Sequence, residues 1–473
     1  MEDLRKIMLI RPWDYKDINN KNPNTSSRTT PLNLLYLASQ LNTNGIPFRL
    51  IDLIPVLIKA KGELNECFSI IRNTLYDFKP DVIGISFFTY QIPDVIHILE
   101  FCKEEIAKKI NCNVKFIAGG VHATAEPLLT LQTMNFDFVF VGEAEIGLVK
   151  IGKGFPYNQI KGVASLEWGL NGVGEQIQDL DSLPPIDLEL CDSNFLLSSM
   201  VHKDFPAEKI LDVMIGRGCV YRCGFCAYHS FSNVRFHSVE YIIKYIISMR
   251  ELYNIDAVVF IDSSIGNNRK LLVELCKQIK NKINSNFKWY ASIRANQVNE
   301  EILSIMWNAG CRCLFYGFES GSQKVLELMN KGCTVEQNRR AVEIHKKLEF
   351  PCVGSMMIGY PGETEEDIKL TIKFIKENPF PNYGVNWFVP LPGSDSYKRI
   401  HGKIENSIDE WRSIGEIVPS KKIYTKIKLA RFKQLYLYSN SLCTVHSTNY
   451  TKFHHLLLWT RHLLLWLRYK SHI

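Results

Sequence analysis

Two long stretches of this 473-residue chain alternate short apolar runs with amphipathic segments, and this alternation limits the fold more than any other feature. In residues 1–150 the apolar runs are rich in Val, Ile and Phe and lie at 6–10, 48–52, 81–88, 114–118 and 137–141. Strands that alternate with helices in this way form a parallel sheet with helices on both faces. We therefore predict a doubly wound α/β domain over residues 1–150.

A second block of the same kind follows after a break. Residues 151–209 lose the alternation and contain Pro184 and Pro185, so we predict a linker with small strands there. Residues 210–395 resume the alternation, with apolar runs at 211–215, 257–261, 288–293, 313–318, 353–358 and 384–389. These β/α units predict an α/β fold, an incomplete (β/α)6 barrel related to the TIM barrel. Residues 396–473 have a helical pattern with a basic bias.

The net charge of the chain is misleading as a single number. The sequence has 56 Lys and Arg against 49 Asp and Glu, a formal net charge of +7. Ten of the basic residues and none of the acidic ones lie in residues 420–473, so residues 1–419 carry 46 basic and 49 acidic side chains. Because the positive charge is confined to one segment, a nucleic-acid partner is not expected.

The 13 cysteines indicate a reducing compartment. No apolar signal segment follows Met1, and no run approaches the roughly 20 apolar residues that a membrane span needs. Cysteines in a chain without an export signal are expected to be thiols or metal ligands rather than disulfides. The sequence thus predicts a cytoplasmic protein.

Three of these cysteines lie close together, directly after the first predicted strand of the second block. The segment reads Cys219-Val-Tyr-Arg-Cys223-Gly-Phe225-Cys226. Thiolates are the usual ligands of iron–sulfur clusters, and three of them leave one iron of a cubic cluster open for another ligand. A structural zinc site with His229 as the fourth ligand is the alternative.

This segment resembles the signature of the radical S-adenosylmethionine (SAM) superfamily, Cys-x3-Cys-x2-Cys with an aromatic residue before the last cysteine. The resemblance implies that Cys219, Cys223 and Cys226 hold a [4Fe–4S] cluster whose open iron chelates SAM, with Phe225 beside it. It also implies that an electron from the cluster cleaves SAM to methionine and a 5′-deoxyadenosyl radical. That radical would remove a hydrogen atom from the substrate.

Later strand ends support the same resemblance. In barrels of parallel strands the chemistry gathers where the strands end at their C-terminal side. Here those ends carry Asp262, Arg294, Glu319, Gly359 and Pro392. The strings GFESGS at 317–322, MNKG at 329–332, GYPGET at 359–364 and PLPGS at 390–394 are similar to the branch of the superfamily with an N-terminal cobalamin-binding domain.

The resemblance to this branch implies SAM contacts at four of the strand ends. Glu319, Arg294 and Asp262 would contact SAM with their side chains. The turn that begins at Gly359 would let the backbone approach SAM closely, because glycine lacks a Cβ atom. The branch often has two acidic residues after its second strand, whereas here Ser263 follows Asp262, so the role of Ser263 is open.

Residues 1–190 resemble the cobalamin-binding domain of that branch, a Rossmann- or flavodoxin-like sheet. Ligands of open parallel sheets bind beyond the C-terminal ends of the strands. The pair Gly119-Gly120 would let a large planar ligand or its nucleotide tail come close. The resemblance implies a cobalamin site formed by Pro12, Ser86, Phe87, Gly119, Gly120, His122, Gly142 and Glu143.

One position departs from many cobalamin proteins, which carry Asp-x-His-x-x-Gly after the first strand and bind cobalt through the histidine. Here that place reads Asp14-Tyr-Lys-Asp-Ile, without a histidine. Many members of the branch also lack it, so the resemblance implies cobalamin binding without a histidine ligand. Two alternatives remain: His122 replaces it rather than packing structurally or contacting the tail of the cofactor, or the domain has lost cobalamin.

The C-terminal residues 452–468 combine Leu and Trp with Lys, Arg and His in the pattern of an amphipathic helix. One interpretation is a terminal helix packed on the barrel. A second is an interfacial helix that makes peripheral contact with the anionic inner leaflet of a membrane. A third is a positively charged dock for an acidic reductant such as flavodoxin or ferredoxin.

These observations together predict a cobalamin-dependent radical SAM enzyme with a [4Fe–4S] cluster, SAM and cobalamin as cofactors. By resemblance, it methylates an unactivated carbon or phosphorus centre of a small or lipid-like substrate through methylcobalamin. The alternative within the branch is oxidative cyclisation, ring contraction or anaerobic hydroxylation. A protein that only binds a metal or cofactor is a different alternative, and it would not cleave SAM to 5′-deoxyadenosine.

Overall fold

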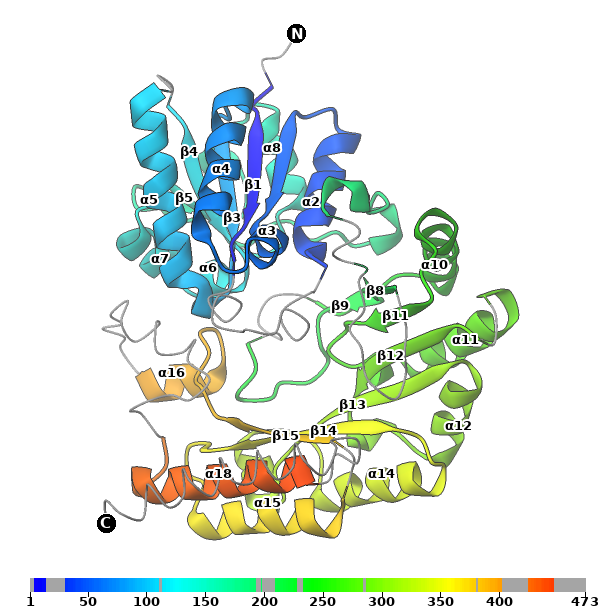
Figure 1. Cartoon of the computed structure of the whole chain (residues 1–473). Helices are drawn as coiled ribbons and strands as arrows, with labels where there is room; N and C mark the ends of the chain where they lie inside the picture. Colours follow the sequence, from blue (N-terminus) through cyan, green and yellow to red (C-terminus); the bar gives the residue numbers. More distant parts are fainter. Residues whose placement is uncertain are drawn as a thin grey trace.

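The computed structural model describes residues 4–13, 30–109, 113–192, 197, 209–227, 233–283, 286–379, 382–401 and 424–445. They build two α/β units, each a sheet with its own helices, which we call the two layers (Figure 1). The N-terminal third of the chain forms one layer, and the later residues form the other. The predicted doubly wound sheet and the predicted incomplete barrel are both confirmed. The domain limits at residues 150, 209 and 395 stay predictions.

The N-terminal sheet has the strand order β2-β1-β3-β4-β5-β6-β7, and its first five strands are parallel. All five predicted strands occur within one or two residues of their expected positions. The strands are β1 (Ile7–Arg11), β2 (Phe48–Asp52), β3 (Val82–Ser86), β4 (Lys115–Gly119), β5 (Phe138–Phe140), β6 (Val163–Ser165) and β7 (Gly169–Leu170). The strand order reverses at β1, and the carboxyl ends of the parallel strands share one edge.

Helices cover both faces of this sheet. One apolar core lies under α3, α4, α5 and α7, and a second lies under α2 and α8. The helices are α2 (Leu32–Thr43), α3 (Leu53–Lys59), α4 (Leu64–Phe78), α5 (Ile92–Lys109), α6 (Val121–Ala125), α7 (Pro127–Met134) and α8 (Glu145–Gly152). Val95, Ile98 and Leu99 of α5 are buried and lie at helical spacing, so they form the apolar face of this helix.

The predicted linker connects both layers. Its strands β6 and β7 extend the N-terminal sheet in antiparallel fashion. Further along, Leu180 and Leu183 pack into the core of the second layer together with Leu35 and Tyr36 of α2. The two layers therefore share buried apolar side chains and are not merely tethered.

The second layer is a parallel six-stranded sheet with the order β15-β14-β13-β12-β11-β8. Strands β8 and β15 are its edges, so the barrel is open. The strands are β8 (Ile210–Val213), β11 (Ala257–Phe260), β12 (Lys288–Ile293), β13 (Cys311–Glu319), β14 (Cys352–Ile358) and β15 (Asn382–Trp387). A separate two-stranded ribbon pairs β9 (Gly216–Arg217) with β10 (Arg235–Phe236).

Five of the six helices described between these strands begin at a side-chain cap, and α13 is the exception. The capping oxygens of Ser238, Asn268, Asn299, Thr334 and Thr364 each accept a hydrogen bond from a backbone N–H three residues later. Such caps satisfy N–H groups that have no partner inside the helix. The helices are α10 (Val239–Tyr253), α11 (Arg269–Gln278), α12 (Glu300–Asn308), α13 (Gln323–Leu328), α14 (Val335–Lys347) and α15 (Glu365–Glu377).

Within the described residues, two further helices follow the barrel, α16 (Asp395–His401) and α18 (Leu429–Val445). Phe432 of α18 is buried and its ring centroid lies 4.6 Å from that of Trp387 at the end of β15. Residues 446–473 lie outside the described residues, so the three interpretations of the basic tail stay predictions. Among the helices of the described ranges, none is both long and apolar enough to cross a bilayer.

Candidate active site

The three cysteines of the signature lie on one loop between β9 and β10. We call residues 218–234 the cluster loop, although residues 228–232, which include His229, are outside the described part of the chain. Cys223 is buried, and Cys219 and Cys226 are half-buried. The strands β9 and β10 pair in antiparallel register at both ends of this loop.

The described part of the cluster loop is anchored to the barrel through its backbone. The N–H of Gly224 donates to the carbonyl of Met329 over 2.7 Å. Ser396 donates to the carbonyl of Gly224 through both its N–H, at 2.8 Å, and its hydroxyl, at 2.6 Å. The amide of Asn330 donates to the carbonyl of Arg222 over 2.8 Å. The cysteines are therefore held in place by contacts that need no bound cluster.

Asp262, at the end of β11, fixes the start of this loop. Its carboxylate accepts hydrogen bonds from the N–H groups of Ile215, at 2.8 Å, and Gly216, at 2.7 Å. Burial raises the pKa of Asp262 to about 7, against the lowering effect of these two bonds. Ser263 has its hydroxyl 3.5 Å from the carbonyl of Gly218, so the residue in the place of the second acid also faces the loop.

Arg294, at the end of β12, lies directly beside a cluster cysteine. Its Nη1 is 3.4 Å from Sγ of Cys223, and its Nη2 is 3.5 Å from Sγ of Cys333. The guanidinium carbon is 3.6 Å from the centroid of the Tyr221 ring, and Nη2 also donates to the carbonyl of Lys331. This places a fixed positive charge where a cluster held by Cys223 would bring negative charge.

Glu319, at the end of β13, forms a buried ion pair with Lys331 over 2.8 Å. Glu319 has a φ of +64°, an unusual backbone conformation that turns the chain at the strand end. The ammonium of Lys331 lies 5.6 Å from the centroid of the Phe225 ring, which places the pair beside the cluster loop. The sequence patterns indicated no role for Lys331 or Cys333, although Lys331 lies in the MNKG string at 329–332.

Gly359 and Glu363 form a closed turn at the end of β14. Glu363 is 2% exposed, and its carboxylate accepts a hydrogen bond from the N–H of Gly359. Gly359 has a φ of +93°, and a Cβ there would lie 2.9 Å from the ring of Phe432. Burial raises the pKa of Glu363 to about 8. No sequence pattern indicated a role for Glu363, because its burial cannot be seen from the sequence.

The Glu363→Gln variant is expected to change how stability depends on pH. Between pH 4.5, the ordinary pKa of this group, and about 8, the unfolded chain releases a proton that the folded protein keeps. Wild-type stability therefore falls as the pH rises through this window. Glutamine still accepts the bond from Gly359 but has no proton to release.

The melting temperature of Glu363→Gln, compared with wild type at pH 6 and pH 9, measures this effect. The melting temperature of the variant minus that of wild type should be several degrees higher at pH 9 than at pH 6. Glu366→Gln is the control, because the Glu366 side chain is 78% exposed. An unchanged difference between variant and wild type at the two pH values would contradict the buried, proton-retaining carboxyl.

The predicted cobalamin residues lie at the carboxyl edge of the N-terminal sheet. Gly120 has a φ of +93°, and a Cβ there would come within 2.7 Å of the backbone nitrogen of Phe87 and 2.9 Å of the hydroxyl of Ser86. The hydroxyl of Ser86 accepts a hydrogen bond from Asn33 over 2.9 Å. Phe88, which sequence reasoning did not select, is 50% exposed at this edge.

Several of the other predicted cobalamin residues are buried within the domain. His122 is fully buried, its Nδ1 lies 3.1 Å from the hydroxyl of Thr89, and its ring lies beside Phe87. Burial lowers the pKa of His122 to about 4, so the ring is neutral. The carbonyl of Pro12 accepts a hydrogen bond from Gln91. His122 thus packs inside the domain, and its role toward cobalamin stays a prediction.

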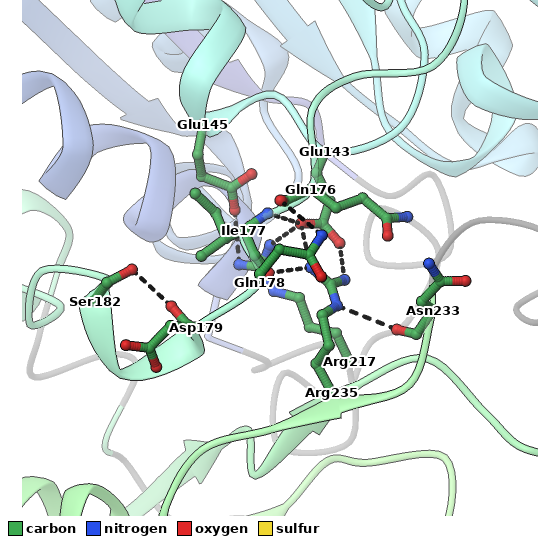
Figure 2. Close-up of polar contacts among 10 residues, drawn as sticks. All are labelled: Glu143, Glu145, Gln176, Ile177, Gln178, Asp179, Ser182, Arg217, Asn233 and Arg235. Carbon is green, nitrogen blue, oxygen red and sulfur yellow. Dashed lines mark hydrogen bonds and ion pairs between the residues drawn. The ribbon is translucent and has the colours of Figure 1, made fainter.

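Gly142 and Glu143 follow β5 at the same edge. The N–H of Gly142 donates to the hydroxyl of Thr124 over 3.1 Å, which ties the β5 end to the segment after the double glycine. Glu143 points away from the sheet toward β9 and β10, where it pairs with Arg217 and Arg235 (Figure 2). The structure thus engages Glu143 in contacts between the two layers.

Comparison with protein families agrees with this geometry. Residues 213–375 match the model of the radical SAM superfamily, and residues 24–151 match the B12 binding domain. The chain belongs to the cobalamin-binding radical SAM enzymes. Its cofactors are therefore a [4Fe–4S] cluster, SAM and cobalamin.

Known relatives cover most of this radical SAM enzyme. An uncharacterized methyltransferase of Pyrococcus horikoshii is 29% identical over 435 residues, or 88% of each chain. The anaerobic magnesium-protoporphyrin IX monomethyl ester cyclase of Rubrivivax gelatinosus is 24% identical over 79% of this chain and 67% of its own. The solved structure of the radical SAM methyltransferase TsrM from Kitasatospora setae has a TM-score of 0.64 at 15% identity. It covers 84% of this chain and 75% of that chain. This last likeness shows a shared fold.

The residues of both sites fit these cofactors. The described part of the cluster loop is anchored by backbone hydrogen bonds and has the guanidinium of Arg294 beside Cys223. At the sheet edge, a Cβ on Gly119 would meet only the carbonyl oxygen of Ile85, at 4.0 Å, so a molecule can approach the backbone there. The predicted SAM and cobalamin contacts of the single residues stay predictions.

In the described ranges, no three His, Cys, Asp or Glu side chains lie close enough together to hold a single metal ion.

One cavity lies apart from the predicted sites of this radical SAM enzyme. A cavity of about 730 Å³ opens beside β2, α3 and α4, lined among others by Asp52, Lys59 and Cys191. None of the predicted site residues lines that cavity.

Proposed function

We propose that this radical SAM enzyme transfers a methyl group to an unactivated carbon or phosphorus centre of a small molecule. The observation that carries the proposal is the direct contact between the end of β5, in the cobalamin-binding domain, and the ribbon that carries the cluster loop. Such a contact is expected if both cofactors serve one reaction. The methyltransferase named above supports the proposal, since it matches 88% of this chain.

When bound, the cluster and SAM supply a radical that removes a hydrogen atom, and cobalamin supplies the methyl group. The chain itself supplies position and charge. Asp262 orients the backbone where the cluster loop begins, and Arg294 holds a positive charge beside Cys223. The ion pair of Lys331 and Glu319 keeps a carboxylate fixed within the buried part of the site.

The N-terminal domain contributes a close backbone surface rather than a cobalt ligand. Gly120 packs against the backbone of residues 86–87 with no room for a Cβ between them, and beside it Gly119 leaves nearly open space where a side chain would stand. His122, buried and neutral beside Phe87, shapes this surface from below. The exposed ring of Phe88 adds an apolar group that displaces water from the same edge.

A second function is a radical reaction without methyl transfer, such as an oxidative cyclisation. The anaerobic ester cyclase of Rubrivivax gelatinosus supports it, because it matches 79% of this chain. Both functions use the same cofactors, so the fold does not distinguish them. They differ in whether the methyl group of SAM is found in the product.

The test is anaerobic reconstitution with iron, sulfide, hydroxocobalamin and methyl-labelled SAM under reducing conditions. We expect 5′-deoxyadenosine together with label on cobalamin, and label on a small molecule when a metabolite extract is added. 5′-Deoxyadenosine with a new product that carries no label would favour the second function. Absence of 5′-deoxyadenosine would contradict both and leave a binding protein.

A further inference from the structure

Four largely buried charged side chains connect the two layers. Arg217 of β9 pairs with Glu143 at 3.0 Å and with Glu145 at 2.6 Å, one carboxylate to each Nη atom. Arg235 of β10 donates from Nη1 to Glu143 over 3.1 Å and also binds it through Nη2. Figure 2 shows both guanidinium groups reaching from the ribbon toward the two glutamates. We call these four residues the latch.

The latch is closed to solvent and balanced in charge. Its side chains are only 6 to 11% exposed, and two carboxylates face two guanidinium groups. The carbonyl of Ile177 accepts from Arg235, and Arg217 also lies 5.3 Å from the centroid of the Tyr36 ring. Removing one partner would leave an uncompensated buried charge, so all four side chains hold one another in place.

The position of the latch in the chain gives it a second property. Arg217 directly precedes the cluster loop and Arg235 directly follows it, and the two residues are paired across the ribbon. The latch therefore holds both ends of the loop that carries Cys219, Cys223 and Cys226. On the other side, Glu143 follows Gly142, whose N–H is bound by Thr124 at the predicted cobalamin edge.

The latch is not needed to hold the two layers together. Leu35 and Tyr36 already share an apolar core with Leu180 and Leu183, which joins the layers without charge. Buried ion pairs add little to stability compared with well-packed apolar side chains. Such ion pairs do fix the orientation of their partners relative to each other, because a guanidinium binds carboxylates through a planar fork of N–H groups.

We propose that Arg217, Arg235, Glu143 and Glu145 set the position of the cluster loop relative to the cobalamin-binding domain. They act as positioning residues, since they fix the loop that holds the cluster rather than the reacting atoms. The inference rests on the proposed function only in its first test, which needs both cofactors bound to one chain. Misplacement by about 1 Å is enough to cost an enzyme roughly a hundredfold in rate, so such a device has a clear use.

The first test measures the distance between the cofactors in the reconstituted enzyme. Reduced cluster and cob(II)alamin are both paramagnetic, so pulsed electron paramagnetic resonance reports their separation. We expect a narrow distribution in wild type and one about twice as broad, or shifted, in Arg217→Lys and Glu145→Gln. Lysine keeps the charge but loses the fork. An unchanged distribution in both variants would overturn the proposal.

The control is Arg431→Lys. Arg431 also binds a carboxylate, that of Glu365, through two nitrogens at 3.0 and 2.6 Å. This pair is partly exposed and joins α18 to α15, away from the loop. Its distance distribution should equal that of wild type. Iron and cobalamin contents are measured for every variant, so that loss of a cofactor is not mistaken for displacement.

The second test needs no cofactor. Hydrogen exchange of the full-length protein as isolated should be about tenfold faster for amides of residues 218–227 in Arg217→Lys and Glu145→Gln than in wild type or Arg431→Lys. Equal exchange in all four proteins would overturn the latch. A wild-type protein that takes up no cobalamin would refute the proposed function, while this exchange measurement would still decide on the latch.

Discussion

Replacing Cys219, Cys223 and Cys226 together by Ala is expected to abolish both the iron–sulfur absorbance and the cleavage of SAM. These three thiols are the only ones in the described ranges that share the cluster loop. Alanine cannot ligate iron, and without a cluster no electron reaches SAM. Iron and sulfide content, the visible spectrum and 5′-deoxyadenosine formation under anaerobic conditions measure the effect, which should be a fall to background.

The backbone contacts of the loop make this variant a fair test. Gly224 is held by Met329 and Ser396 through bonds that no cysteine side chain makes, so the fold should survive the substitution. Cys191→Ala is the control, because Cys191 is a half-buried free thiol beside the separate cavity at β2. Full iron content in the triple variant would refute the assignment. Stoichiometric zinc in anaerobic wild-type protein would favour the zinc alternative.

The sequence predicted the strands of both sheets because local patterns determine them. Apolar runs such as residues 288–293 and 353–358 coincide with parallel strands whose residues are buried or half-buried along their whole length. The cysteine signature was equally accessible, since its spacing lies within eight residues of one loop. Features that depend on neighbours in sequence were therefore recovered.

The remainder of the site depends on contacts between distant residues. The place of Glu143 after a strand gave no indication of its partners Arg217 and Arg235, which lie more than 70 residues away in the sequence. Lys331 could not be paired with Glu319 from spacing alone. Burial was likewise invisible for His122, and it is burial that makes the ring neutral.

Introducing a leucine at Gly120 is expected to remove bound cobalamin while leaving the cluster in place. The φ of +93° at Gly120 already disfavours any other residue, and a Cβ would lie 2.7 Å and 2.8 Å from backbone atoms of Phe87. Backbone atoms cannot move aside as a flexible side chain can. The larger side chain would therefore push Gly120 and residues 86–87 apart, and these residues form the edge at which cobalamin is predicted to bind.

The measurement is the cobalamin and iron content of the reconstituted Gly120→Leu variant. Cobalamin should fall at least about tenfold while iron stays near the wild-type level, because the cluster loop is anchored within the barrel by Met329 and Ser396. Gly45→Leu is the control: Gly45 has a similar positive φ of +67°, but a Cβ there meets nothing within 4 Å. The two variants thus share the backbone strain and differ in the close approach at the sheet edge. If both bind cobalamin as wild type does, the predicted site at Gly120 is wrong; if both lose it, strain in the domain explains the loss and the edge is not the reason.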